Sequence, residues 1–263
     1  MMRRNYRRGF VHTSPGILLA IHQRLAARFR PTTCGALPPS GGRANAERHA
    51  QIGLRPIPQV VGWWPAEGPF EVAVGAILTQ RTAWRNVEAA LAHLRRAGML
   101  SPRRLARAPL RRLQSWIRPA GFYRQKAPRV RAFARYLVAH HQGNLTRWLR
   151  GPLLQVRQEL LALPGVGPET ADSILLYAGG RPSLVVDAYT HRILSRHGLV
   201  PPGLRYEALQ QWCVERLPRR RQLYDLFHAL VVEVGKRYCR ARPHCRHCPL
   251  NVFPLAKSVR SVD

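Results

Sequence analysis

From residue 69 to residue 236, apolar residues recur at the three- and four-residue spacing of an α-helix, and prolines and glycines repeatedly interrupt that spacing. No stretch alternates apolar and polar residues as a half-buried strand does. The sequence therefore predicts an all-α fold of many short helices with tight connections. The predicted helices are 16–30, 69–79, 84–97, 102–107, 110–117, 123–141, 145–149, 153–163, 168–178, 188–196, 204–216 and 221–236.

The charge of the chain is strongly basic. Its 263 residues include 43 Lys and Arg against 13 Asp and Glu, which gives a formal net charge of +30. Such a charge favours a polyanionic partner, and nucleic acid is the first candidate. The alternative is an arginine excess that only reflects genome base composition, because the only lysines are Lys126, Lys236 and Lys257.

The cysteines and the hydropathy indicate a compartment. Five cysteines, three of them crowded near the C-terminus, do not form an even disulfide framework, so a reducing compartment is expected. No apolar run approaches the roughly 20 residues that a membrane span needs. We therefore expect a cytoplasmic, nucleoid-associated protein without a membrane partner. The Arg-rich start of the chain is either a targeting segment or a flexible arm from an over-extended start.

A sharp turn lies inside "ELLALPGVGPETADSILLY", residues 159–177. Leucines at helical spacing precede Gly165-Val166-Gly167, and Pro168 suits the first turn of the next helix, where its missing N–H costs nothing. The bare amides of such a turn and the positive helix N-terminus can hold a phosphate. An ordinary helix–turn–helix connection is the alternative. The spacing favours a helix-hairpin-helix motif over about 157–178.

An aspartate stands in "LVVDAYTHRIL", where Asp187 follows three apolar residues and precedes a helical pattern. Taken alone, it is the N-cap of that helix, a role worth about 1 kcal/mol.

The hairpin and this aspartate together resemble a known signature. "LPGVGPETA" followed by "VVDAYTHRI" is similar to the motif of the helix-hairpin-helix (HhH-GPD) base-excision DNA glycosylases, the endonuclease III superfamily. "PFEVAVGAILTQRTAWRNVEAAL" resembles the early helix pair of that family, and "AGFYRQKA" resembles its Gly-x-Tyr-x-x-Lys-Ala segment. The resemblance covers about 63–250 and looks closest to the subgroup that includes 3-methyladenine DNA glycosylase III.

The resemblance implies a fold and a set of site residues. It implies two helical subdomains flanking a DNA-binding cleft, with Asp187 as the catalytic carboxylate at its mouth and Gln80 as the residue that wedges into DNA. The base pocket would contain Trp63, Trp64 and Trp84, with plain core packing as the alternative for each. The other implied DNA contacts are Gly165, Val166, Gly167 and Thr170.

Glu169 is a departure from the bifunctional relatives, which carry a lysine two residues past the second hairpin glycine. A carboxylate cannot form the imine that the lyase reaction needs. The resemblance then implies a monofunctional glycosylase in which Asp187 acts with water. Such a site suits N3- or N7-alkylated purines, because these bases are already cationic leaving groups, and aromatic side chains would attract them. Reaching the base requires flipping it out of the duplex.

Two other functions remain open at this point. One is a glycosylase for another lesion with weak AP-lyase activity. The other is a non-catalytic helix-hairpin-helix DNA-binding protein, which would have no need of a carboxylate such as Asp187 at its DNA face.

The C-terminal cysteines have the spacing Cys239-x5-Cys245-x2-Cys248, close to the iron–sulfur loop of the family, but Pro254 stands where its fourth cysteine would be. Three alternatives follow: a [4Fe–4S] cluster with an outside ligand, a zinc ion held by three Cys and one His, or a metal-free vestige. Candidate fourth ligands are Cys34, Cys213, His244 and His247.

These observations predict a domain order. Residues 1–15 form a flexible basic arm, 16–30 a helix that packs on the C-terminal subdomain, and 31–66 a Pro- and Gly-rich insertion. Residues 67–181 form a helical barrel ending in the hairpin, and 182–263 a C-terminal subdomain with the Cys-rich loop at 239–254. We expect a monomer that acts on double-stranded DNA.

Overall fold

The computed structural model describes residues 16–29 and 66–256. The predicted arm, nearly all of the predicted insertion, and Trp63, Trp64, Cys34 and Lys257 lie outside these ranges. Within them the chain is helical and contains no strand, which confirms the all-α prediction. No helix in these ranges has both the length and the apolar character to span a bilayer.

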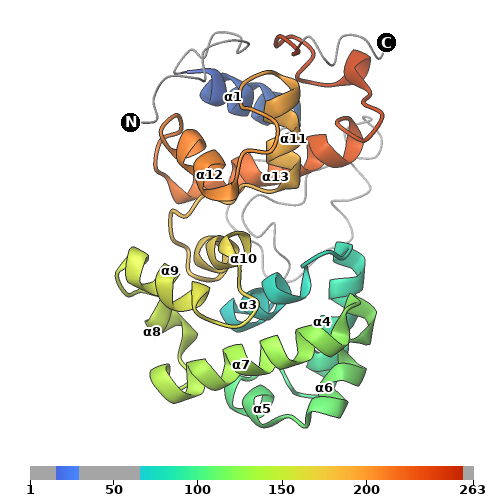
Figure 1. Ribbon diagram of the computed structural model, residues 1–263. Helices are drawn as coiled ribbons and strands as arrows, with labels where there is room; N and C mark the ends of the chain where they lie inside the picture. Colours follow the sequence, from blue (N-terminus) through green and yellow to red (C-terminus); the bar gives the residue numbers. More distant parts are fainter. Residues whose placement is uncertain (1–15, 30–65, 257–263) are drawn as a thin grey trace, which may run out of the picture. The chain divides into compact units, whose positions relative to one another are not determined.

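The described residues form two compact units, and the chain passes from one to the other after Val185. The central unit comprises 66–185 (Figure 1). Its helices are α3 (Pro69–Leu78), α4 (Trp84–Arg96), α5 (Pro102–Arg107), α6 (Leu110–Trp116), η1 (Arg118–Ala120), α7 (Tyr123–His141), α8 (Leu145–Leu149), α9 (Leu153–Leu161), α10 (Pro168–Ser173) and the π-helix η2 (Ile174–Ala178).

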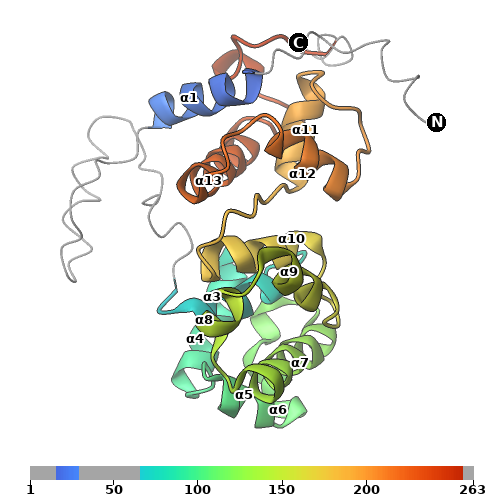
Figure 2. The ribbon, with the colours of Figure 1, turned by 90° about the vertical axis from the view of Figure 1, so that its left-hand side faces the viewer.

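The C-terminal unit comprises 16–29 and 186–256 (Figure 2). Its helices are α1 (Ile17–Phe29), α11 (Ala188–Arg196), α12 (Tyr206–Val214), α13 (Arg221–Arg237) and the short η3 (Cys245–His247).

Helix α7 organises the central unit, because α3, α5, α6 and α8 all pack against it. Its buried face places Phe133 against Phe70 and Trp148. Lys126 lies in the same face with 2% exposure, and its Nζ donates to the carbonyl oxygens of Leu78 and Ala120, each at 2.8 Å. Burial, and then the nearby charge of Arg129, lowers the pKa of Lys126 to about 8. This lysine therefore joins the end of α3 to the end of η1.

Helix α13 plays the corresponding part in the C-terminal unit, where α1 and α11 pack against it. The contact with α11 is close: a Cβ added at Gly235 would lie 2.2 Å from Cδ1 of Tyr189. Arg24 of α1 donates to the carbonyl of Pro249, so the N-terminal helix is also bonded to the Cys-rich loop.

The hairpin helices α9 and α10 are joined by a buried ion pair. Arg157 donates to both carboxylate oxygens of Asp172, at 2.8 and 2.9 Å, and Ser183 donates to Oδ1 at 2.6 Å. Asp172 is fully buried, so this network holds the hairpin and the segment that leads out of the central unit in one arrangement. The predicted helix 168–178 is interrupted here, since its last five residues are π-helical.

Replacing Asp172 with Ala should destabilise the protein by about 3 kcal/mol, because it leaves the Arg157 guanidinium without its bidentate partner. Urea unfolding followed by circular dichroism measures this loss. Glu215→Ala is the matched control, since it removes a carboxylate of which about half is exposed, paired with Arg216, and should cost less than about 0.5 kcal/mol. Equal losses in the two variants would contradict the role given to the buried pair.

Candidate active site and nucleic-acid interface

The hairpin turn is built around Gly165, whose φ is +75°. The N–H of Val166 is already used, since it donates to the carbonyl of Leu163 at 3.1 Å, and the Val166 side chain is 5% exposed. The amides of Gly165 and Gly167 have no partner among the described residues. They are the two turn amides that can bind a phosphate at the N-terminus of α10.

Gln80, in the turn after α3, is bonded to this hairpin. Its Nε2 donates to the carbonyl of Gly165 at 2.8 Å and to Oγ1 of Thr170 at 3.1 Å. Its Oε1 accepts from Nη1 of Arg129 at 2.9 Å. Thr170 is itself buried. The side chain of Gln80 thus fixes the hairpin turn, and its insertion into DNA stays a prediction, as do the DNA contacts of the hairpin residues.

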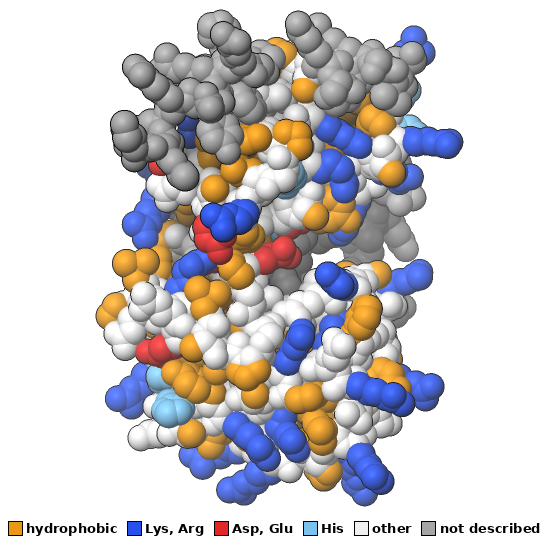
Figure 3. All heavy atoms as spheres, viewed as in Figure 1, with side chains coloured by type: hydrophobic (Ala, Val, Ile, Leu, Met, Phe, Trp, Pro, Cys, Tyr) orange, Lys and Arg blue, Asp and Glu red, His pale blue; other side chains and the backbone are white. Residues whose placement is uncertain are grey.

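Arg81 and Arg129 are cations beside the hairpin that the sequence patterns did not single out. Arg81 is exposed and has a positive φ of 53°, which is uncommon for a residue other than glycine and often marks a functional turn. Arg129 lies so close to the turn that a Cβ at Gly165 would be 2.2 Å from its Cδ. Figure 3 shows that Lys and Arg side chains are widespread on the face it displays and acidic ones are few.

Glu169, the residue in place of the lyase lysine, is exposed in the first turn of α10. Glu169 thus places a negative side chain at the N-terminus of α10, where the positive end of the helix dipole stabilises it. The central unit between 66 and 185 contains a single lysine, Lys126, which is buried and bonded to two carbonyls. No amine on this unit is therefore positioned as a nucleophile.

Asp187 caps helix α11 with one of its two carboxylate oxygens. Oδ1 accepts from the N–H of Thr190 at 2.8 Å and from its hydroxyl at 2.9 Å, and the N–H of Asp187 donates back to Oγ1 at 3.2 Å. This reciprocal arrangement is a capping box. The capping role and a catalytic role are not exclusive, because both cap bonds converge on Oδ1 and leave Oδ2 for another partner.

His228 of α13 faces that second oxygen. Its Nε2 lies 3.7 Å from Oδ2 of Asp187, and the two side chains are 8% and 12% exposed. Burial raises the pKa of Asp187, but the hydrogen bond and charge of His228, with the bonds from Thr190, outweigh it and hold the pKa below its ordinary value. Asp187 is therefore a nearly buried carboxylate that is ionised at neutral pH.

Trp84 is the only predicted base-pocket residue within the described ranges. It is the first residue of α4, and it is partly buried against the apolar core of the central unit. This position agrees with the alternative of core packing. A contact of Trp84 with a flipped base stays a prediction.

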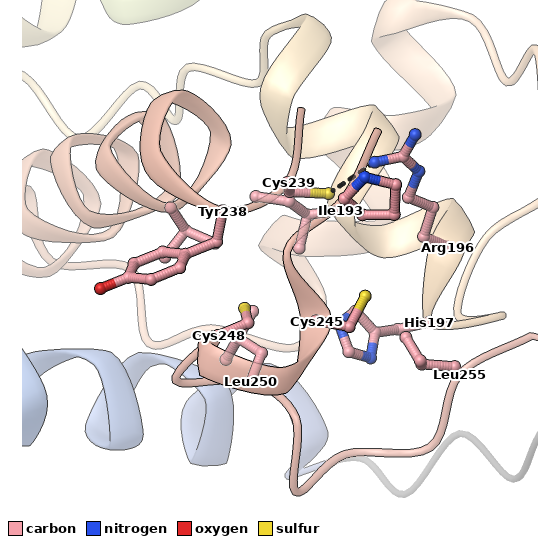
Figure 4. Close-up of a pocket in the computed structure, with 11 residues that line it drawn as sticks. Ile193, Arg196, His197, Tyr238, Cys239, Cys245, Cys248, Leu250 and Leu255 are labelled. Atoms are coloured by element: carbon pink, nitrogen blue, oxygen red, sulfur yellow. Dashed lines mark hydrogen bonds between the residues drawn. The ribbon is translucent and has the colours of Figure 1, made fainter. Parts of the chain in front are cut away.

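The three C-terminal cysteines line one pocket (Figure 4). Cys239 accepts a hydrogen bond at its sulfur from Nη1 of Arg196 at 3.3 Å, and burial raises the pKa of Cys248 to about 11. Among the described residues, no group of three such side chains is close enough together to hold a metal ion. The pocket thus brings three thiols to one place without arranging them as a ligand set.

His197 also lines this pocket, although the sequence analysis did not select it. Its Nδ1 lies 2.9 Å from the carbonyl oxygen of Pro254, the residue that stands in place of the fourth cysteine, so its Nε2 is the nitrogen left over for another partner. The proposed alternatives do not line the pocket: His244 and His247 are exposed, and Cys213 is buried in α12 with its pKa raised to about 12 by burial.

Comparisons with known proteins agree with this geometry. The family model described as "HhH-GPD superfamily base excision DNA repair protein" matches residues 74–219. The chain is 43% identical over 197 residues to the Methanocaldococcus jannaschii protein named "Putative DNA repair glycosylase MJ1434", covering 74% of this chain and 89% of that protein. It is 35% identical over 184 residues to endonuclease III of Thermotoga maritima, covering 68% and 79% of the two chains.

Two solved structures extend the comparison. The H. pylori 3-methyladenine DNA glycosylase (MagIII) bound to 1,N6-ethenoadenine is 27% identical with a TM-score of 0.61, covering 73% of this chain and 94% of that one. A non-covalent endonuclease III–DNA complex is 21% identical with a TM-score of 0.69, covering 95% and 98%, and shares the fold.

Replacing Gly165 with Ala should weaken DNA binding about tenfold, because an alanine at positive φ costs roughly 1–2 kcal/mol and its Cβ would displace Arg129. Fluorescence anisotropy with a labelled duplex measures the affinity.

Gly203→Ala is the control, since Gly203 also has a positive φ, at +77°, but lies in the C-terminal unit with nothing within 4 Å of an added Cβ. It should strain the backbone and leave DNA affinity unchanged. An unchanged affinity in Gly165→Ala would mean that the hairpin turn makes no contact with DNA.

Proposed function

This chain belongs to the HhH-GPD superfamily of base excision DNA repair proteins and is a DNA glycosylase, and we propose that it is a monofunctional enzyme that removes alkylated purines from double-stranded DNA by hydrolysis. The observation that carries the proposal is the pair of Asp187 and Glu169. The first is a nearly buried carboxylate with Oδ2 outside the cap bonds, and the second replaces the amine that a lyase requires.

In the proposed reaction Asp187 stabilises a sugar with oxocarbenium character and directs a water to it. The C1′–N bond breaks and its electron pair leaves with the base, while the water oxygen bonds to C1′ and Oδ2 of Asp187 takes the water proton. The products are the free base and an abasic site. A low pKa suits this role, because only the ionised carboxylate stabilises positive charge on the sugar.

The lysines support hydrolysis over imine formation. Lys126 is 2% exposed and donates to two backbone carbonyls, so its nitrogen cannot reach a sugar without breaking both bonds. Lys236 on α13 lies 4.0 Å from Glu233, and its side chain is about half exposed. Neither lysine is in the hairpin, where a Schiff-base amine stands in the bifunctional relatives.

Alkylated purines are the substrate class that this site can release without further help. A purine alkylated at N3 or N7 already carries positive charge, so it needs no acid to protonate the leaving group. The similarity of this chain to the H. pylori 3-methyladenine DNA glycosylase supports the same class of substrate. The relatives named endonuclease III favour a second candidate, a glycosylase for another lesion with weak AP-lyase activity.

The C-terminal pocket supports a separate proposal for the cofactor, which takes no part in the reaction. Three thiols and the Nε2 of His197 are the types of donor that bind a [4Fe–4S] cluster or zinc, and they would have to move closer together to hold either one. The carbonyl of Pro254 fixes the other ring nitrogen of His197, as carbonyls commonly do for metal-binding histidines. We propose His197 as the fourth ligand, with Cys239 released from Arg196 on binding.

The function is tested on duplexes that contain an N3- or N7-alkylated purine, ethenoadenine, an oxidised pyrimidine or a mismatch. The wild-type protein should release the alkylated purine fastest, measured by chromatography of the free base. Asp187→Asn should reduce that release by at least about a hundredfold and leave duplex affinity unchanged or tighter, because a charge that repels phosphate is gone.

Borohydride added to the same reactions should trap no covalent protein–DNA adduct. A strong trapped band would overturn the monofunctional assignment and favour the second candidate. Binding without base release from any duplex would favour the non-catalytic alternative, and full activity in Asp187→Asn would remove the catalytic assignment of that residue.

Anaerobically purified protein should be brown and contain about four irons per chain if the pocket holds a cluster. Elemental analysis should show that Cys239→Ala, Cys245→Ala, Cys248→Ala and His197→Ala each lose the metal. His244→Ala and His247→Ala are the matched controls and should retain it. One zinc per chain would identify the other metal, and a metal-free wild-type protein would overturn the proposal.

A further inference from the structure

We propose that His228 is a positioning residue for the reaction: it holds Oδ2 of Asp187 in the direction from which that oxygen acts and keeps the carboxylate ionised. The inference rests on the proposed catalytic role of Asp187. No motif in the sequence singled out this histidine, since it lies 41 residues after the aspartate, inside the apolar pattern of α13.

The first observation is that the two oxygens of Asp187 have different partners. Oδ1 receives both bonds from Thr190, at 2.8 and 2.9 Å, and these bonds begin α11. Oδ2 faces Nε2 of His228 at 3.7 Å. A carboxylate held only at Oδ1 could still swing Oδ2 about that point. A second contact from another helix removes this freedom.

The second observation is burial. His228 is 8% exposed and Asp187 12%, so water screens their interaction little. The two residues come from α11 and α13, which pack closely where Tyr189 covers Gly235. The separation of the imidazole and the carboxylate is therefore fixed by helix packing and not by flexible side chains alone.

The third observation is a second carboxylate next to His228. Asp225 lies one turn earlier on α13, is 5% exposed, and has one oxygen buried without a hydrogen-bond partner among the described residues. Burial raises the pKa of Asp225 to about 6, while the charges of Arg221 and His228 lower it. The imidazole thus lies close to two carboxylates, one on its own helix and Asp187 at the start of α11.

The arginines Arg192 and Arg24, on the helices packed against α13, have partners of their own. On α11, Arg192 donates to the carbonyls of Gly235 and Cys239. On α1, Arg24 donates to Pro249, and the ring of His22 lies 6.4 Å from that of Phe227. His191 on α11 has its Nε2 buried without a partner among the described residues. None of these contacts replaces His228 at Oδ2.

The experiment compares three variants by the pH dependence of single-turnover base release from an alkylated duplex. His228→Phe keeps a buried ring without a donor, His228→Gln keeps a donor without the ring, and His22→Gln is a matched control at a partly buried histidine of the same unit. Duplex affinity and urea unfolding, measured on the same samples, show that each variant folds and binds.

We expect base release to fall roughly tenfold to a hundredfold in His228→Phe and less in His228→Gln, with duplex affinity unchanged. Burial raises the pKa of Asp187, and His228 opposes this effect. Without His228 the pKa should therefore rise, and the carboxylate should become protonated at a higher pH. The acidic limb of the rate profile should therefore move to higher pH in His228→Phe.

A second readout separates positioning from packing. His228→Ala should regain activity when imidazole is added to the buffer, whereas Asp187→Asn should not. A wild-type pH profile in His228→Phe, or no effect of imidazole on folded His228→Ala, would overturn the role of His228. If the wild-type protein releases no base at all, the proposed function fails instead, so the two failures are distinguishable.

Discussion

Two hydrogen bonds from Thr190 to Oδ1 of Asp187 begin helix α11, and the orientation of the candidate catalytic carboxylate depends on them. They determine which way the carboxylate points, because an oxygen that accepts both the N–H and the hydroxyl of one residue has little freedom to rotate. The same aspartate is therefore both a structural cap and the candidate catalytic group. A helix N-terminus also favours a negative charge, so the cap helps to keep the group ionised in a nearly buried position.

In the hairpin, side chains hold the turn through a backbone carbonyl and leave two backbone amides available for a ligand. The amide nitrogen of Gln80 donates to the carbonyl of Gly165, and the amide oxygen of Gln80 accepts a hydrogen bond from Arg129. The turn is thus fixed through a carbonyl, and the amides of Gly165 and Gly167 remain for an anion. The buried pair of Arg157 and Asp172 fixes the two hairpin helices against each other.

The helices could be predicted from the sequence because their signals are local. Proline and glycine end many of the apolar patterns, and the predicted ranges 123–141, 145–149 and 188–196 have the observed bounds. The π-helix at 174–178 could not be predicted, since it depends on how the chain leaves the hairpin and not on its apolar spacing. Asp187 and Glu169 were found because a motif frames them.

No sequence motif surrounds His228, Arg129 or His197, because the contact that matters for each is made with a residue distant in sequence. Their contacts to Asp187, Gln80 and Pro254 span 41, 49 and 57 positions. Periodicity reports only that such a residue lies on a helix and which neighbours share its face. A long-range pair of polar side chains becomes visible only once the helices are packed.

The absence of a hairpin amine and the environment of Asp187 belong to one chemical argument. An amine that attacks the sugar forms a covalent bond, which relieves the positive charge that develops there. Without it, the charge on the sugar must be stabilised by an ionised group nearby, and burial alone would oppose that ionisation by raising the pKa of Asp187. The contact of His228 with the second oxygen, together with the bonds from Thr190, outweighs the effect of burial and lowers the pKa of Asp187. In the proposed hydrolytic reaction, Glu169 stands where an amine would act, and the pairing of Asp187 with His228 is the feature of the C-terminal unit that would stabilise the charge instead.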